Sequence, residues 1–359
     1  MYKYCSYCGH QASQDANFCT KCGTGFEDVT YSFEYQSMNG RNDSEENENG
    51  EARTEEQANE STAQFYQDSF SADTIDKITA DLKIYSIEVT AADVDEVKIS
   101  WEKTESWRLT PMMKGRTLHL KENNRIGMHN IHDFFHNSGH NVIRIEVPAA
   151  KAIDLELENE VGTITVADIK ISAWGELKSS IGKIDVRNVE VPDALTVSTT
   201  TGSIRIDNLE AGQTVKLSSQ IGKIQADHVK TGTFYTNNTS GKCVLNDILA
   251  SGQFTVTGGV GEAVLDEITA EKMDIRMNAT GNVNCQNLYA DSSISIYNTV
   301  GNITCGIRDD AANYTTHCHS DQGRNNYPEV SGKGNKRLNV RTTLGSVDIF
   351  FTGTKEQAE

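Results

Sequence analysis

The chain has 359 residues, and its formal net charge of -18 argues against a nucleic-acid-binding surface, because phosphate recognition needs clustered Lys and Arg. No long apolar run and no basic leader followed by an apolar segment occurs, so we expect neither a transmembrane helix nor a standard secretion signal. We therefore expect a cytoplasmic protein, which reaches the membrane surface at most through a bound partner.

Residues 1–26 carry two Cys-x-x-Cys pairs, Cys5 with Cys8 and Cys19 with Cys22. Each pair forms a tight knuckle, and four converging thiolates complete the closed tetrahedral shell that is typical of structural zinc. A closed shell leaves no open position for a substrate. We predict one structural Zn2+ at these four cysteines; disulfides or a chance pattern are the alternatives.

The segment resembles the short zinc ribbons at the N-termini of many bacterial proteins, in which a Cys-x-x-Cys-Gly knuckle precedes a sequence close to "ANFCTKCG". The resemblance implies a binding or positioning module. Its fold should depend on the metal, because so short a segment cannot build a sufficient core.

Residues 27–66 are rich in Glu, Asn, Gln, Ser and Gly and poor in aliphatic side chains. Such a composition buries too little apolar area to offset the entropy lost on ordering. We predict a disordered acidic linker that its own charge keeps extended, so that the ribbon is tethered to the rest of the chain.

Residues 67–150 have β character without a regular repeat, as in "DLKIYSIEVTAADVDEVKISWE" and "NVIRIEVP". We expect an irregular β cap and the first coils of the larger fold. Between these strands, "MHNIHDFFHNSGH" holds His129, His132, His136 and His140 at spacings that would suit a metal on a helical turn. A loop between two strands is the simpler interpretation, and the sequence leaves its role open.

Residues 151–351 repeat with a period of 19 or 20 residues, marked by Gly162, Gly182, Gly202, Gly222, Gly241, Gly261, Gly281 and Gly301. Apolar residues follow each of these glycines at two and four positions, and at seven positions in all repeats except the last, where Ile307 comes one position early. They recur at 13 and 15 positions in several repeats. The period of two predicts short strands separated by turns. The constant phase predicts a solenoid in which each apolar column forms one interior stack.

We predict an all-β fold, a single-stranded parallel β-helix (β-solenoid) with about 20 residues per coil, expected to be right-handed, plus the small N-terminal zinc ribbon. A helical repeat is disfavoured because apolar spacings of three and four are missing. An antiparallel sandwich or curled meander is the alternative, although neither explains the constant phase. Residues 352–359 form a charged tail.

A polar column stands three residues before the repeat glycines, comprising Asn159, Ser179, Thr199, Ser219, Asn238, Asn278 and Asn298, with Gly258 in one repeat. We expect these side chains to form a ladder that bonds the backbone at a bend. Cys285 and Cys305 share one phase in adjacent repeats, so they should be neighbours. Filling of the core is their favoured role, and a redox pair is the alternative.

The order of parts from about residue 70 to 350 resembles a bacterial family of putative adhesins with β-strand repeats and a domain of unknown function. The matching stretches are "IEVTAADVDEVKISWE", "VIRIEVPAAKAIDLELENEVGTITV" and the Gly-x-Ile-x-Val repeats. The resemblance implies a β-helix without a catalytic residue. Some relatives are associated with envelope stress responses.

Our hypothesis is a non-enzymatic interaction, scaffold or sensing protein with protein partners, in which the ribbon adds a tethered second contact. It is compatible with a homo-oligomer, and the resemblance suggests a link to envelope stress. The alternative is a polysaccharide lyase or hydrolase, since outward positions five and six after the glycines carry potential cation ligands: Asp207, Asp227, Asn246, Asp266, Asp247 and Glu267. Turn formation explains these residues more simply, and no basic cluster accompanies them.

Overall fold

The computed structural model describes residues 2–4, 11–13, 64–103, 109–122 and 141–353. They belong to two compact units, Met1–Glu60 and Ser61–Glu359. In the first unit, β1 (Tyr2–Tyr4) pairs antiparallel with β2 (Gln11–Ser13). The second unit begins with β3 (Gln64–Ser71), which includes the last residues that we assigned to the linker. Most of that linker and the end of the tail lie outside the described residues, so their predicted disorder stays a prediction.

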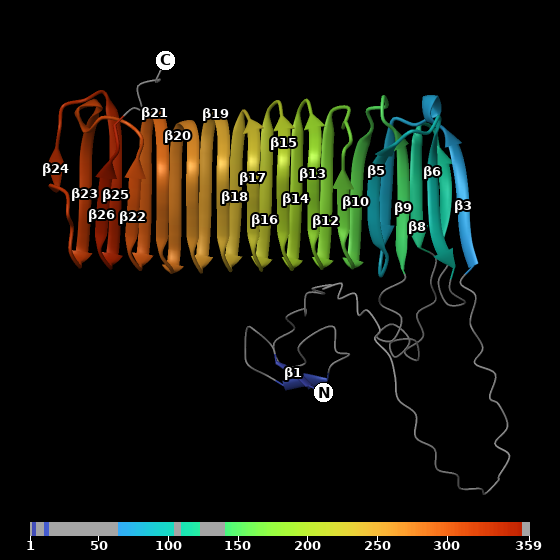
Figure 1. The fold of residues 1–359 in the computed structure, drawn as a ribbon, viewed down its shortest axis with the longest axis horizontal. Helices are drawn as coiled ribbons and strands as arrows, with labels where there is room; N and C mark the ends of the chain where they lie inside the picture. Colours follow the sequence, from blue (N-terminus) through green and yellow to red (C-terminus); the bar gives the residue numbers. More distant parts are fainter. Residues whose placement is uncertain (1, 5–10, 14–63, 104–108, 123–140, 354–359) are drawn as a thin grey trace, which may run out of the picture. The chain divides into compact units, whose positions relative to one another are not determined.

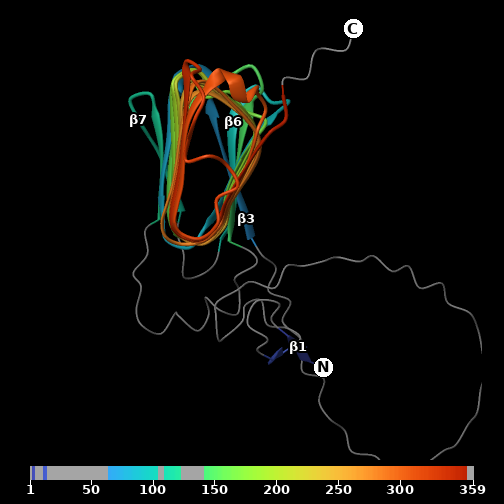
Figure 2. The same ribbon diagram turned by 90° about the vertical axis from the view of Figure 1, so that its left-hand side faces the viewer.

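The second unit is a parallel β-solenoid with two broad sides (Figures 1 and 2). Side A contains β10 (Asp154–Val161), β12 (Trp174–Ile181), β14 (Ala194–Thr201), β16 (Thr214–Ile221) and β18 (Thr233–Ser240). Side B contains β11 (Ile164–Ala167), β13 (Ile184–Val191), β15 (Ile204–Ala211) and β17 (Ile224–Thr231). Within each side, every strand pairs in parallel with the strand of the next coil.

The next three coils each run as one continuous strand, namely β19 (Cys243–Val260), β20 (Ala263–Thr280) and β21 (Val283–Val300). Their first halves continue side B and their second halves continue side A. The predicted all-β solenoid with coils of about 20 residues is therefore confirmed. The hand of the coil stays a prediction.

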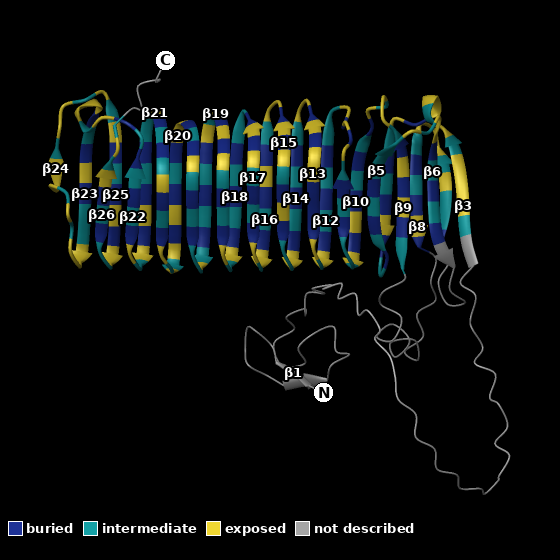
Figure 3. Ribbon diagram, viewed as in Figure 1, coloured by how far each residue is buried: buried dark blue, intermediate teal, exposed yellow. Residues whose placement is uncertain are grey.

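Alternation along every strand sends each second side chain into the interior. The columns two, four and seven residues after the repeat glycines are buried along the whole stack, from Ile164 and Val166 to Ile303 and Cys305, as the dark blue bands of Figure 3 show. Bulky neighbours stack across coils, and the rings of Phe234 and Phe254 lie 5.4 Å apart. The predicted apolar columns are confirmed, and they form one continuous core.

Two kinds of corner turn the chain between the sides. Gly202 shows why the first needs glycine: its φ is +152°, and a Cβ there would overlap the carbonyl oxygen of Gly182 in the preceding coil. The second corner, six residues after the repeat glycine, has φ between 49° and 59°, a region that Asn and Asp tolerate best among non-glycine residues. The residues at this second corner are Asp168, Asn188, Asn208, His228, Asp247, Glu267 and Asn287.

The polar column lies inside the bend at the repeat glycines, as predicted. Asn238 donates from Nδ2 to the carbonyl oxygen of Gly222 at 3.0 Å, and Asn298 donates in the same way to Gly281 at 2.8 Å. The hydroxyls of Ser179, Thr199 and Ser219 make equivalent contacts of 3.4 Å with the glycine of the preceding coil. The ladder thus ties consecutive coils together.

The prediction is wrong for Asn278, which is exposed. Met277 takes the inward position instead, paired in register with Gly258 on one side and Asn298 on the other. The physical reason is a register shift on each side of this segment, which moves the inward position back by one residue. Gly258 leaves the required space, because a Cβ at that position would overlap the Met277 sulfur.

At the N-terminal end, the coils do not stack in sequence order. One coil consists of β4 (Lys77–Leu82) and β5 (Ser86–Ala92), and the next along the chain contains β8 (Thr117–Glu122) and β9 (Val142–Pro148). The first of these coils is stacked between the coil of β10 and β11 and the coil of β8 and β9. Antiparallel pairs finish this end: β6 (Glu96–Lys103) with β9 and with β3, and β7 (Leu109–Lys114) with β8. A short 3-10 turn, η1 (Ala72–Thr74), precedes β4.

A similar exchange occurs at the C-terminal end. The second half of β21 pairs with β25 (Lys336–Leu344), and β22 (Ile303–Ile307) pairs with β26 (Val347–Phe351). After the 3-10 turn η3 (Ala311–Asn313), β23 (Tyr314–Gln322) lies outside β25 and pairs antiparallel with β24 (Val330–Ser331). The last strand along the chain, β26, is therefore not outermost in space.

Candidate functional surfaces

The residues of the predicted zinc site, Cys5, Cys8, Cys19 and Cys22, lie outside the described residues. The histidine-rich stretch from His129 to His140 also lies outside them. Within the ranges that the structure does describe, no group of three or more His, Cys, Asp or Glu side chains is placed to hold a metal ion. The zinc site and the role of the histidine loop stay predictions.

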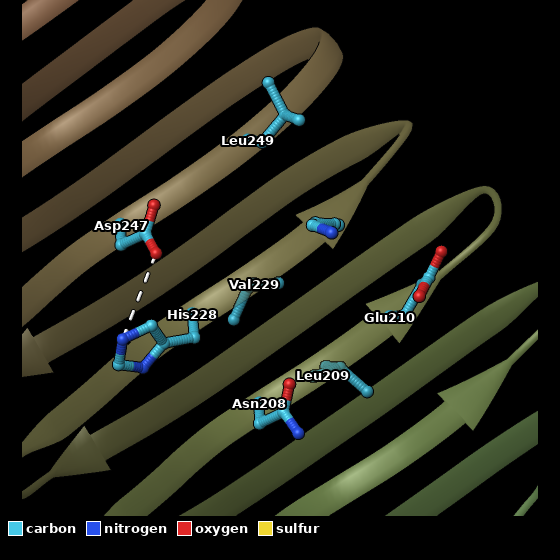
Figure 4. A pocket seen from close by; sticks show the side chains of 8 residues that line it. Asn208, Leu209, Glu210, His228, Val229, Asp247 and Leu249 are labelled. Atoms are coloured by element: carbon cyan, nitrogen blue, oxygen red, sulfur yellow. Dashed lines mark ion pairs between the residues drawn. The ribbon is translucent and has the colours of Figure 1, made fainter.

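A shallow groove follows the second corner on side B (Figure 4). His228 is its central polar residue: Nδ1 lies 3.4 Å from Asp207, and Nε2 lies 3.9 Å from Asp247. Its lining residues are Asn208, Leu209, Glu210, His228, Val229, Lys230, Asp247 and Leu249. The groove is open and spans three successive corners, so it suits contact with a flat surface better than enclosure of a small substrate.

The acidic row that we considered as a cation site is engaged by its own neighbours. The corner amides bond along the stack, with Asn188 Nδ2 donating to Asp168 at 2.6 Å and Asn208 Nδ2 donating to Asn188 at 2.9 Å. Asp227 accepts from Gln225 at 2.8 Å, and Asp266 accepts from Asn287 at 2.9 Å. These contacts agree with the simpler interpretation that the row forms turns.

Side A carries a surface that the sequence-based reasoning missed. Its outward side chains on β14, β16, β18 and the second half of β19, here called the hydroxyl-rich face, are Thr196, Ser198, Thr200, Lys216, Ser218, Gln220, Tyr235, Asn237, Thr239, Thr255 and Thr257, with Gly259. Lys216 is the only one of these twelve residues that is charged at neutral pH. The matched positions on side B are mostly charged: Asp185, Arg187, Glu190, Arg205, Asp207, Glu210, Gln225, Asp227, Lys230, Val244, Asn246 and Leu249.

The signal for this face was present in the sequence. Outward polar residues alternate with inward residues in "LTVSTT" and "FTVTG", and this alternation recurs in the two coils between them, with Lys216 as the one charged outward residue. It becomes a surface only when parallel stacking brings these short stretches into one plane. Interface centres are depleted in charged residues and enriched in tyrosine, and antibody paratopes are rich in Tyr, Ser, Gly and Asn.

An ion pair lies near the C-terminal end, between Lys336 Nζ and Asp309 Oδ2 at 2.7 Å, with side chains 18% and 2% exposed. Burial raises the pKa of Asp309, but hydrogen bonds from Lys336, Asn313 and the Asp310 amide outweigh it, so this pKa lies below its usual value. Lys336 also lies 4.3 Å from the centre of the Tyr289 ring. These contacts hold the turn before β23 against β21, which is a structural role.

The predicted neighbours Cys285 and Cys305 are paired in register in adjacent coils, and both are buried. A hydrogen bond with Cys305 and complete burial raise the pKa of the Cys285 thiol well above its usual value. Burial likewise raises the pKa of Cys243 to about 12. A thiol needs to ionise to react, so this geometry favours core filling over a redox role.

Two family models match the chain. The model of the Toastrack DUF4097 domain matches residues 75–350, and that of a zinc-ribbon domain matches residues 2–26. The chain belongs to the Toastrack DUF4097 family. The Toastrack match covers the solenoid from Ile75, just before β4, to Phe350 within β26, and the ribbon match covers all four predicted zinc ligands. Both resemblances inferred from the sequence are confirmed.

Two crystal structures are similar to this Toastrack chain over most of its length. A putative cell adhesion protein from Clostridium sporogenes is 9% identical, covers 81% of this chain and all of its own, and has a TM-score of 0.20. A putative adhesin from Bacteroides fragilis is 12% identical, covers 80% of this chain and 97% of its own, and has a TM-score of 0.35. These scores are too low for either structure to inform function. No curated protein matches the chain.

The described part of the chain contains no helix that is long and apolar enough to cross a membrane.

Proposed function

We propose that this Toastrack protein is a non-enzymatic interaction, scaffold or sensing protein that binds protein partners through its outward surface. The contrast between the hydroxyl-rich face and side B carries the proposal. A flat surface with one charge among twelve positions is unusual on a chain of net charge -18. Interface centres are depleted in charge and enriched in tyrosine, which matches this face around Tyr235.

The interior supports the same conclusion. The core columns are closed and apolar. The pKa values of the buried Cys243 and Cys285 thiols are raised, which keeps both in the unreactive protonated form. The side-chain chemistry available to other molecules in the described ranges therefore lies on the two broad sides and at the corners. A rigid stack of coils holds those positions at fixed spacing, which lowers the entropic cost of binding.

The zinc ribbon would serve as a second, tethered contact. The family match at residues 2–26 supports one structural Zn2+ at Cys5, Cys8, Cys19 and Cys22. A flexible tether raises the effective concentration of the second contact once the first is made. We place the protein in the cytoplasm, where a partner recruits it to the membrane, and the family resemblance supports a link to envelope stress.

An assay for released sugar on a panel of neutral and acidic polysaccharides tests the non-enzymatic part of this proposal. We expect no product from the wild-type chain with or without added calcium. Product that disappears in Asp227→Ala would overturn the proposal, because it would place catalysis on the acidic row. Asn237→Ala, on the opposite side, is the matched control.

A further inference from the structure

The hydroxyl-rich face lies between an acidic strand, β10, and a basic strand, β25; side A continues beyond them through β4 and β8 in one direction and through β23 in the other. Along side A, β18 lies midway between β10 and β25: β16, β14 and β12 separate it from β10, and β19, β20 and β21 separate it from β25. The outward residues of β10 are Glu156, Glu158 and Glu160. Those of β25 include Arg337 and Arg341.

One charge on each of these strands, Glu158 on β10 and Arg341 on β25, lies at a matching height. Following the parallel register from strand to strand, Glu158 aligns with Ser198, Asn237 and finally Arg341. Tyr235 lies on the middle strand, β18, two residues before Asn237, and its ring is 5.8 Å from Lys216 Nζ. A two-fold axis running along β18 would therefore place β10 of one copy opposite β25 of another, with Glu158 facing Arg341.

We propose that two copies of this chain pair face to face through side A, with their solenoid axes antiparallel and the two-fold axis along β18. The inference rests on the proposed function in treating the hydroxyl-rich face as protein-binding, and it names the occupant of that face. The acidic strand β10 of one copy faces the basic strand β25 of the other, and this contact occurs twice, once on each side of the axis. The uncharged face fills the centre, with Tyr235 of the two copies meeting at the axis.

The dimensions of side A suit a stable pair. The nine side A strands from β10 to β25, spaced about 4.8 Å apart and about eight residues long, give a face of roughly 40 Å by 25 Å. That is about 1,000 Å2 per copy, compared with about 800 Å2 per partner in a standard interface. Viewed along the solenoid, the central coils superpose closely, so that the side is flat rather than strongly twisted (Figure 2).

The charges favour a second copy over an unrelated partner. An unrelated protein would need a basic patch and an acidic patch at the same separation, on a flat and charge-poor surface, whereas the chain supplies both itself. The charges of β10 and β25 are only partly paired within one copy. Glu156 pairs with Lys77 at 2.6 Å and Arg341 with Asp321 at 3.1 Å, whereas Glu158 and Arg337 have no ion pair within the described residues. On side A between β10 and β25, Lys178 pairs with Glu176 on β12 and Arg276 with Asp274 on β20 within one copy, whereas side B intersperses charges of both signs throughout.

Sedimentation velocity on the full-length chain tests the pairing. We expect a dimer that weakens as salt is raised, because opposite charges at the interface rim are screened. The double variants Glu156→Lys with Glu158→Lys, and Arg337→Glu with Arg341→Glu, should each associate at least about tenfold more weakly, because like charges then face each other. Glu190→Lys with Glu210→Lys, on side B, makes the same charge change as the first variant and should leave the dimer intact.

Mixing the two interface variants gives the decisive result. A lysine variant paired with a glutamate variant has opposite charges at both ends, so a heterodimer should re-form although neither variant pairs with itself. A monomeric wild-type chain, or a dimer that these charge reversals do not weaken, overturns the inference. If the wild type is a monomer that still captures another protein through side A, self-pairing fails while the proposed function stands.

Discussion

At the scale of single residues, the stability of the stack depends on polar side chains inside the bends. The polar ladder residues Ser179, Thr199, Ser219, Asn238 and Asn298 each donate to a backbone carbonyl of the preceding coil, as Asn238 does to Gly222 and Asn298 to Gly281. A buried carbonyl that loses its partner keeps the cost of its desolvation. The polar column is therefore a structural element and not a row of unused functional groups.

Replacing Asn238 with Ala should lower the free energy of unfolding by about 1–3 kcal/mol, because it leaves the Gly222 carbonyl without this donor and opens a small cavity. Asn237→Ala is the matched control: the neighbouring side chain points outward, and its loss should change stability by about 0.5 kcal/mol or less. Urea denaturation followed by circular dichroism measures both. Equal effects of the two substitutions would contradict a bonded ladder.

The Asp309–Lys336 pair predicts a pH dependence. The pKa of Asp309 is lowered in the folded chain, so its contribution to stability is present above the usual carboxyl range and is lost as pH falls through the lowered value. Lys336→Met leaves this carboxylate buried without its ammonium partner and should cost about 3 kcal/mol at pH 7. The difference from wild type should be smaller at about pH 3, because the buried carboxyl of the variant, without its ammonium partner, is then protonated and no longer carries an uncompensated charge. Denaturation midpoints that differ equally at both pH values would exclude this role.

The buried thiols should be inert in the folded chain. We expect Cys285 and Cys305 to stay unmodified by a thiol reagent at about pH 8 and to react fully in urea, because burial keeps them protonated and covered. Mass spectrometry of the labelled peptides reads each position separately. Native labelling, or a disulfide between the two residues, would support the redox alternative instead.

At the scale of elements, the regular coils were predictable and the ends were not. The repeat glycines and the columns that include Ile184 and Val186 set the phase of each coil, so local periodicity was sufficient for the solenoid. The exchange of β4 and β5 with β8 and β9 has no local signature, because it depends on which strands pair across long sequence separations. Met277 replaced Asn278 in the ladder because register shifts around this segment changed the phase within one coil.

Of the two candidate surfaces, the corner row could be predicted from the sequence and the hydroxyl-rich face was missed. The corner row was visible as turn-forming Asp and Asn residues, and its bonded geometry follows from φ values that such residues tolerate. The hydroxyl-rich face was missed because its uncharged residues carry no motif in any single repeat. It is defined by the absence of charge across several stacked strands, which a residue-by-residue search for reactive groups does not detect.

The zinc ribbon makes a prediction at the same scale. The purified chain should contain about one zinc ion, and Cys19→Ser should lower the metal content, because three thiolates no longer close the tetrahedral shell. Elemental analysis after dialysis against a weak chelator measures this. Cys243→Ser, which alters a buried thiol of the solenoid, is the control and should retain the metal. Unchanged zinc in Cys19→Ser would contradict the assignment.

At the scale of the whole molecule, the chain combines a solenoid with an N-terminal segment that matches the zinc-ribbon family model. Parallel stacking makes every coil depend on its neighbours, and the exchanged strands at both ends finish the stack with antiparallel pairs. The resulting solenoid presents two sides of contrasting charge, one suited to a charge-poor interface and the other to polar contacts. The proposed function assigns binding to these surfaces and to the ribbon.

Affinity capture from a lysate of the native host tests this account most directly, with full-length baits compared by quantitative mass spectrometry. The baits are the wild type, Cys19→Ser with Cys22→Ser, and Ser198→Glu with Thr257→Glu on side A. We predict a protein enriched by the wild type and reduced severalfold by the cysteine variant, the side A variant or both. Identical capture by all three baits, or no protein enriched by the wild type, would contradict the central claim that the chain acts by binding through these surfaces.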